Sequence, residues 1–299
     1  MSEPVSRPRF TESRAASFVY IGFVYVVVLA AVWWMFGMFA ASPVVAIVLG
    51  LLVAALICWF ATLAVNNGSV FDAYWSVLPP AVAVFLVSDS SFATTTPRQI
   101  AVLVVVWVWA IRLTSNWARS FAGLHYEDFR YLELYEKTPL PRWAVQLLLV
   151  ELAPAVQVIL GCLALYPAMT MGSSSFSVLD GVALAIGISA VLLQFVADQQ
   201  MRKFIRAGVP GANMEAGAWR YSRHPNYFGE ILFWVSLWLF SVSAAPEVWW
   251  TSIGPLAMIA MFVFASVPMM ENRSRARRPG YDVYASRTSA LVPWLPKKG

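Results

Sequence analysis

The sequence predicts an all-α, polytopic transmembrane helix bundle of about eight spans. Three observations predict this fold class. Of the 299 residues, 60% are hydrophobic and only 12% are charged, the mean hydropathy is +0.66, and residues 15–71 contain no charged side chain. A helix needs about 20 apolar residues to cross a bilayer, so this stretch is too long for one span and sufficient for two. The length alone would suit one or two soluble domains, but the composition assigns the chain to the membrane class.

The remaining apolar runs predict further spans in order along the chain. The third run is short and contains Pro79-Pro80, so we expect a broken or re-entrant helix there. The fifth is long and carries Glu151, Pro154 and Pro167, which predicts a kinked or tilted helix. The predicted spans are 18–40, 43–65, 74–88, 99–118, 143–171, 178–197, 227–245 and 249–270.

The basic residues predict the orientation of these spans. Arginine and lysine concentrate in the N-terminal segment, in the 119–142 and 198–226 loops and in the C-terminal tail, whereas the connections 40–43, 172–177 and 241–250 contain none. Eight spans place all the basic segments on one side, which the positive-inside rule makes cytoplasmic, together with both termini. Seven spans would separate the N-terminal arginines from the rest. We therefore expect a single multi-pass domain, 1–299, in a bacterial inner membrane. The basic residues behind the net charge of +5 then lie at the membrane surface, and we expect no nucleic-acid partner.

The segment Arg220–Glu230 is the most informative polar stretch. It runs directly into an apolar span, and polar groups at that density beside a bilayer are costly unless a ligand or partner satisfies them. His224 precedes a proline, which predicts a helix boundary there, with Asn226 at the N-cap or in the first turn. Glu230 follows four residues later on the same face. The alternative is that Glu230 pairs with Arg223 or His224, and that Tyr221 and Tyr227 are interfacial anchors.

Two further segments carry arginine with polar partners. Arg112, Asn116 and Arg119 would share one helix face, and so would Asp198, Arg202 and Arg206. Guanidinium groups bind phosphate bidentately and stack on flat rings, so arginine among phenols and amides suits a dinucleotide phosphate. For any one arginine, the alternative is a lipid-headgroup contact. The chain has no GxGxxG, P-loop or nucleophile-elbow motif, and its two cysteines and two histidines give no metal-site spacing.

These segments resemble the steroid 5α-reductase family, in the branch formerly catalogued as a domain of unknown function. The resemblance rests on Arg220–Glu230, on Asp198–Arg206 and on the tail Pro279–Ser289, and it is strongest over the C-terminal region 195–296. It implies a membrane reductase that moves hydride from NADPH to a carbon–carbon double bond conjugated with a carbonyl. The implied substrate is a hydrophobic small molecule, either steroid-like or another lipid, met in contact with membrane lipids.

The resemblance also implies residue roles. Asn226 and Glu230 would contact the nicotinamide amide, and arginines would bind the phosphates. The candidate cofactor-binding residues are Arg112, Asn116, Arg119, Asp198, Arg202, Arg206, Arg220, Tyr221, His224, Asn226, Glu230, Tyr281, Tyr284 and Arg287. Steroid reductases polarise the substrate carbonyl with a Glu–Tyr pair from the N-terminal half, which this chain does not match position by position. Asp72 and Tyr74 are the candidate catalytic substitutes, with Tyr126 or Glu127 as reserves.

Two other functions share parts of this pattern. Membrane methyltransferases of the isoprenylcysteine and phospholipid type are similar in an Arg-His-Pro-x-Tyr-x-Gly segment and bind S-adenosylmethionine. Asn226 together with Glu230 favours the reductase, as do the phosphate-binding arginines. The third class is a non-enzymatic transporter or lipid-binding membrane protein. Against it, the ionisable residues gather at one membrane face instead of following a path across the bilayer.

Overall fold

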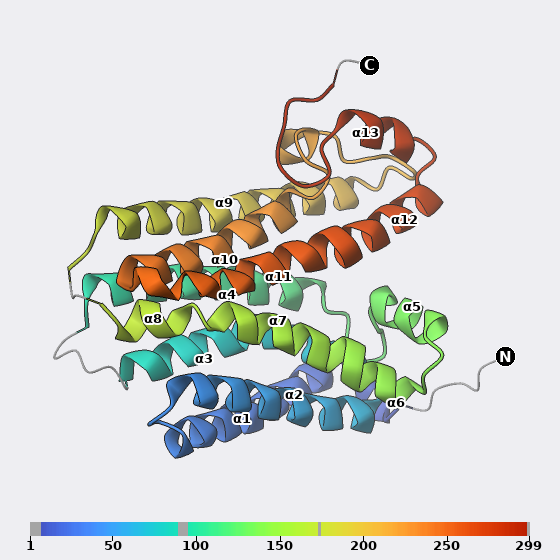
Figure 1. Cartoon of the computed structure of the whole chain (residues 1–299). Helices are drawn as coiled ribbons and strands as arrows, with labels where there is room; N and C mark the ends of the chain where they lie inside the picture. The colour runs from blue at the N-terminus through green and yellow to red at the C-terminus, as the bar shows by residue number, and fades with distance from the viewer. Residues whose placement is uncertain (1–6, 89–94, 173–174, 298–299) are drawn as a thin grey trace.

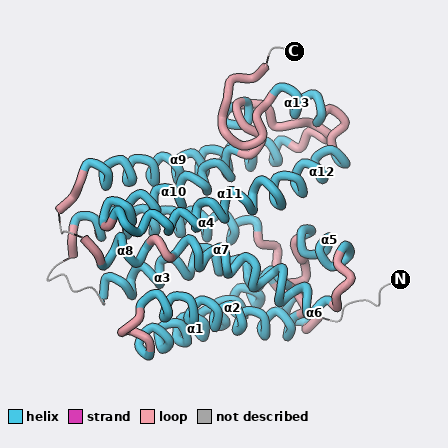
Figure 2. The backbone as a smooth tube through the Cα atoms, in the orientation of Figure 1, coloured by secondary structure: helices cyan, strands magenta, loops and turns pink. Residues whose placement is uncertain are grey.

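The computed structural model describes residues 7–88, 95–172 and 175–297. Within these ranges the chain is helical, without a strand (Figure 2). The helices are α1 (Arg14–Met38), α2 (Pro43–Val65), α3 (Tyr74–Ser88), α4 (Pro97–Ser120), α5 (Phe129–Lys137), α6 (Arg142–Val145), α7 (Ala153–Cys162), α8 (Leu165–Thr170), α9 (Val178–Ala207), α10 (Pro225–Ala244), α11 (Ile253–Met261), α12 (Val267–Arg277) and α13 (Tyr281–Arg287). Short 3-10 helices cover Arg9–Glu12, Gly68–Ala73, Gly217–Arg220 and Pro246–Ser252, and π-helical segments cover Gln146–Leu152 and Phe262–Ser266.

Eight helical stretches are long and apolar enough to cross a membrane, which confirms the predicted all-α bundle. They are Arg14–Met38, Pro43–Val65, Gly68–Ser88, Pro97–Ser120, Arg142–Thr170, Val178–Ala207, Pro225–Ala244 and Pro246–Arg277. Large apolar side chains also lie on the outside: Trp34 is 64% exposed and Phe264 82%. A helix that is apolar on all faces is suited to pack against protein on one side and lipid on the other.

The third span is continuous, contrary to the expected break at Pro79-Pro80. The 3-10 helix Gly68–Ala73 leads straight into α3, and the Asn67 side chain caps it by accepting from the Ser69 N–H at 2.9 Å. Each proline removes one backbone donor, but most of this span is buried among other helices. Surrounding protein can therefore compensate the freed backbone groups.

The fifth span, for which a kink or tilt was predicted, changes its helical geometry twice. The π-helical segment Gln146–Leu152 precedes Pro154, and a turn at 163–164 separates α7 from α8 before Pro167. Both changes of helical geometry precede a proline, and such sites are the usual causes of a kink.

The bundle has one end that gathers most of the basic segments. Figure 1 shows α1 and α2 below, α3, α7 and α8 in the middle, and α9, α10 and α12 above. Helix α10 packs along α9, and α4 packs against both α3 and α9. We call the end where α1 begins and where α4, α9 and α12 finish the basic end. Helices α5, α6 and α13 lie there too (Figure 1).

Candidate functional site

The Arg220–Glu230 stretch forms the entrance to α10 at the basic end. His224 has a non-helical backbone, and Pro225 occupies the first turn of α10, where its missing N–H and fixed φ cost nothing. Asn226 therefore lies in the first turn, and Glu230 follows one turn further into the span. Gly229 faces α9 closely, since a Cβ there would lie 2.6 Å from the Gln194 side chain.

The Glu230 carboxylate is held by donors from three helices. On Oε1 it accepts from the Trp234 indole N–H at 3.0 Å. On Oε2 it accepts from the Trp109 indole at 3.0 Å and from the Gln194 amide at 2.6 Å. Several donors on one carboxylate fix its orientation. The alternative pairing of Glu230 with Arg223 or His224 is wrong; its ion-pair partner is Arg112, at 3.6 Å.

Arg112 joins the two predicted segments on α9 and α10. One guanidinium nitrogen lies 2.9 Å from Asp198 Oδ2, and the other faces Glu230. One arginine thus bridges two carboxylates that come from different helices. The ion-pair partner of Asp198 is Arg112 on α4. Among the described residues, no carboxylate lies within ion-pair distance of Arg202, one turn further along α9.

Unpartnered buried polar atoms occur on the residues of this bridge and on the helices that flank it. Within the described part of the chain, Arg112 Nε, Gln194 Oε1, Arg202 Nε and Asn226 Oδ1 are buried without a hydrogen-bond partner. Native proteins rarely leave such atoms unpaired, and each one costs about 1–3 kcal/mol. Donors and acceptors that are left open at one place are what a polar, ring-bearing ligand would satisfy.

Other predicted residues hold the C-terminal segment in place. Arg223 donates to Glu271 Oε1 at 2.7 Å and to the Ala285 carbonyl at 2.9 Å. Tyr284 donates its hydroxyl to the Trp219 carbonyl at 2.5 Å, and burial raises its pKa well above the ordinary value. Tyr281 is buried beside the same cluster, and its burial, with Glu271 nearby, also raises its pKa.

The histidine of the stretch also faces this cluster. His224 Nε2 lies 3.6 Å from Glu271 Oε1, and its ring stacks on Tyr227, with centroids 5.1 Å apart. The phenol of Tyr227 stacks in turn on Phe262. This stack joins the start of α10 to the last span.

The remaining candidate cofactor residues lie apart from the Glu230 cluster. Asn116 is half-buried and makes no side-chain hydrogen bond to the described residues. The others are exposed: Arg119, Arg206, Arg220, Tyr221 and Arg287. Arg287 donates to the Val283 carbonyl of its own helix.

The candidate catalytic residues do not converge as expected. Tyr74 is fully buried, and its hydroxyl donates to the Leu51 carbonyl at 2.7 Å, so it faces the core. Tyr126 is 56% exposed. Asp72 instead accepts from the Tyr131 hydroxyl at 2.5 Å. Tyr131 was not among the residues predicted from the sequence, although its position in the first turn of α5, after the cap Asp128, is a signal for an ordered side chain.

Glu127, the reserve catalytic candidate, is held by ion pairs and hydrogen bonds. It is 3% exposed and pairs with Arg7 at 2.7 Å and with Arg142 at 2.5 Å. It also accepts from the Gly68 N–H and from the Tyr135 hydroxyl. This cluster holds the start of α5 against the turn that carries Asp72.

The ion pair between Asp128 and Arg130 lies next to Tyr131 in the sequence. Asp128 caps α5 and accepts two hydrogen bonds from Arg130 at 2.9 Å each. Burial, and then the charge of Asp72, raise the pKa of Tyr131 well above the ordinary value. The phenol therefore stays protonated at neutral pH, and its single O–H donates to Asp72.

An apolar groove of about 730 Å³ opens between α1, α3 and α4. Trp33 and Trp107 lie on its two walls, and Pro80 lies between them. At its polar end, Thr114 donates to the Ser76 hydroxyl at 2.8 Å. Ser76 follows Asp72 by four residues, so the polar end of the groove lies about one helical turn from that carboxylate.

The fold and these spans define an integral, multi-pass membrane protein. The family model described as "Protein of unknown function (DUF1295)" matches residues 58–288, and the chain therefore belongs to that family. The chain is also similar to "Uncharacterized protein C594.04c" of Schizosaccharomyces pombe, with 27% identity over 278 residues, covering 83% of this chain and 80% of that protein. No solved structure matches it.

Proposed function

We propose that the protein is a membrane-embedded, NADPH-dependent reductase of the carbon–carbon double bond in a hydrophobic enone. The observation that carries this proposal is the Glu230 site, where an anchored carboxylate lies among unpartnered buried donors and acceptors. The resemblance to steroid 5α-reductases supplies the reaction class. It covers the same stretch, Arg220–Glu230.

The residues divide into two binding tasks. Asn226 and Glu230, four residues apart at the entrance of α10, would bind the carboxamide of the nicotinamide, whose amide offers both a donor and an acceptor. Arg202, half-buried with an open Nε, would bind phosphate, with exposed Arg206 one turn further along. When bound, NADPH would supply the hydride.

Tyr131 is the residue best suited to polarise the substrate carbonyl. A donor that faces the carbonyl oxygen stabilises the negative charge that develops there as hydride arrives. Without substrate, the single O–H of the phenol donates to Asp72 at 2.5 Å. To polarise the carbonyl, it would turn from Asp72 to the substrate oxygen. This carboxylate–phenol pair takes the place that the sequence analysis gave to Asp72 and Tyr74.

The apolar groove supports a hydrophobic substrate. Its volume of about 730 Å³ lies within the range of small-molecule pockets, roughly 300–1,000 Å³. It opens along helices that present apolar side chains outward, such as Trp33 at 50% and Trp107 at 44% exposure. A substrate could therefore arrive from the lipid phase.

The test is a thermal-shift comparison of the purified protein with NADPH, NADH and S-adenosylmethionine. Selective stabilisation by NADPH is expected, because a ligand that binds only the folded state raises its stability by mass action. Stabilisation by S-adenosylmethionine alone would reassign the site to a methyltransferase. No response to any of the three would favour a non-enzymatic lipid-binding protein.

The matched variant is Glu230→Gln. It keeps the shape of the side chain but turns a pure acceptor into a group that must also donate, and the two indoles and Gln194 already donate toward it. We expect the NADPH shift to disappear while the protein elutes as a folded species. Glu136→Gln, an exposed change on α5, should leave the NADPH shift intact. Wild-type NADPH affinity in Glu230→Gln would contradict the proposal.

A further inference from the structure

The chain continues beyond α13 as an extended tail with an apolar, exposed tip. Val292 is 55% exposed, Trp294 73% and Leu295 74%. Pro293 and Pro296 flank this tip and prevent it from joining a helix. A contiguous exposed apolar patch of this kind is typical of an interaction surface.

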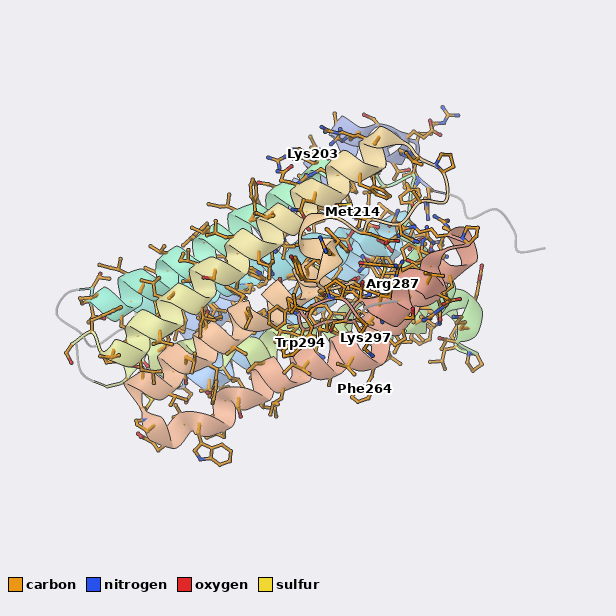
Figure 3. All side chains as sticks on the ribbon, turned by 90° about the horizontal axis from the view of Figure 1, so that it is seen from above. Lys203, Met214, Phe264, Arg287, Trp294 and Lys297 are labelled. Carbon is orange, nitrogen blue, oxygen red and sulfur yellow. The ribbon has the colours of Figure 1, made fainter. Side chains whose placement is uncertain are left out.

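The tail lies at the basic end of the bundle, along its side. In Figure 1 the tail and α13 sit above the ends of α9 and α12, next to the sides of the helices. Figure 3, seen from above, shows Trp294 over the bundle, on the side where the tail stands above the helices in Figure 1.

Cations border this tip. Arg287 is exposed and belongs to α13, and its carbonyl accepts from the Lys297 N–H at 3.0 Å. The two basic residues therefore lie side by side, and Figure 3 shows both near Trp294. Tryptophan with arginine and lysine is the combination that marks a membrane–water interface, with the indole at headgroup depth and the cations on phosphates.

The base of the tail is bonded to the entrance of α10. The Arg223 N–H donates to the Ser289 carbonyl at 2.8 Å, and the Trp294 N–H donates to the Tyr221 carbonyl at 2.9 Å. Between them, the Ser222 hydroxyl donates to the Leu291 carbonyl at 2.7 Å. Any force that fixes the tail in one position also fixes the segment Tyr221–Arg223.

From these contacts we propose that the tail, residues 289–297, is an interfacial anchor that inserts Trp294 and Leu295 into the anionic lipid surface at the basic end and thereby orders the entrance of α10. The partner is a bilayer leaflet that carries anionic phospholipid. Charge complementarity with Arg287 and Lys297, beside the exposed indole of Trp294, selects this partner. The inference concerns the loop that the proposed cofactor site uses, but it does not require that site to bind NADPH.

The first experiment locates the tip by fluorescence. The two native cysteines, Cys58 and Cys162, are fully buried, so Leu295→Cys can be labelled selectively with an environment-sensitive dye such as NBD. In nanodiscs of phosphatidylglycerol and phosphatidylcholine, we expect blue-shifted emission that lipid-borne nitroxides quench and aqueous iodide does not. Ser286→Cys, on the exposed side of α13, is the control and should be quenched by iodide. Equal iodide quenching at both positions would overturn the proposal.

Two further fluorescence measurements identify what the tip of the tail contacts. Removing phosphatidylglycerol, or combining Arg287→Gln with Lys297→Gln, should shift the dye at position 295 toward water-like emission. A buried signal that persists in detergent and depends on protein concentration would instead identify a second copy of the chain and would overturn the lipid assignment.

The second experiment tests the coupling to α10 by hydrogen exchange. Trp294→Gln combined with Leu295→Gln should accelerate exchange of the amides in 221–223 at least about tenfold in nanodiscs, with Ser286→Gln as the unchanged control. Unchanged exchange in the double variant would overturn the ordering role. NADPH binding, measured separately, distinguishes this result from a failure of the proposed reductase function.

Discussion

Arg112 is the residue on which the candidate site converges. Its guanidinium faces Asp198 and Glu230 at once, and its Nε remains open. A buried charge pair that lacks one partner is strongly destabilising, whereas a pair with satisfied hydrogen bonds can be tolerated. The site therefore holds its acids in place without ligand but leaves donors and acceptors for one.

Arg202 offers a specific test of the phosphate assignment. Its Nε is buried and open, and a hydrogen bond to a charged group contributes about 1.5–3 kcal/mol. If it binds the ribose phosphate that distinguishes NADPH from NADH, Arg202→Ala should weaken NADPH binding by about tenfold or more and change NADH binding little. Titrations of both nucleotides, with Lys203→Ala as the exposed control, measure this. Equal losses for NADPH and NADH would place the residue at the shared pyrophosphate.

Asp128 makes the stability of the folded protein depend on pH in the acid range. Burial alone would raise its pKa, but the hydrogen bonds from Arg130 lower it below the ordinary value. A carboxylate with a lowered folded-state pKa contributes stability above its unfolded pKa, about 3.9, and loses that contribution as pH falls through the folded value. Asp128→Asn should therefore flatten the decline in melting temperature below about pH 4. Glu136→Gln should retain the wild-type decline, and an unchanged profile in Asp128→Asn would contradict the assignment.

At the scale of whole elements, a small residue on α7 sets the position of the Glu230 site. A Cβ on Gly161 would lie 2.2 Å from the Trp234 ring, and that indole donates to Glu230. Glycine there lets α7 approach α10 closely enough for Trp234 to fill the contact. The orientation of the carboxylate therefore depends on how two helices pack.

This packing predicts a large effect from a small change. Gly161→Ala should displace the Trp234 indole and destabilise the protein by about 1–3 kcal/mol, the usual cost of overpacking, and it should weaken NADPH binding with it. Gly22→Ala is the matched control, because a Cβ at Gly22 meets nothing within 4 Å. Thermal denaturation and nucleotide titration of both variants measure the effect. Equal behaviour of the two would show that Trp234 adjusts freely.

Hydropathy was sufficient to predict the spans, but the contacts that hold the site are long-range. The sequence predicted the α10 entrance because Pro225 is a local signal. It could not predict that Glu230 meets Trp109, 121 positions earlier, because such pairs depend on how helices pack. Pro79-Pro80 suggested a break in the third span, but the span is continuous because the surrounding protein compensates the freed backbone groups. Tyr131 was missed for the same reason as Trp109, since its partner Asp72 lies 59 positions away.

For the whole molecule, the two ends of the bundle differ in charge. The described part of the opposite end includes Arg98, which pairs with Asp180 at 2.8 Å, so the two charges cancel there. The basic end carries the exposed arginines Arg119, Arg206 and Arg220. From this asymmetry and the positive-inside rule, we propose that the basic end faces the cytoplasm.

The orientation can be checked with single cysteines, because Cys58 and Cys162 are buried and should not react. Ser42→Cys lies in the exposed turn between α1 and α2, and Ser286→Cys lies on α13. A membrane-impermeant maleimide should label Ser42→Cys in intact cells but reach Ser286→Cys only after lysis. The unsubstituted protein reports background labelling. Labelling of Ser286→Cys before lysis would place the basic end outside, where the cellular NADPH pool could not reach Arg202 and Glu230, and the reductase proposal would fail with the topology.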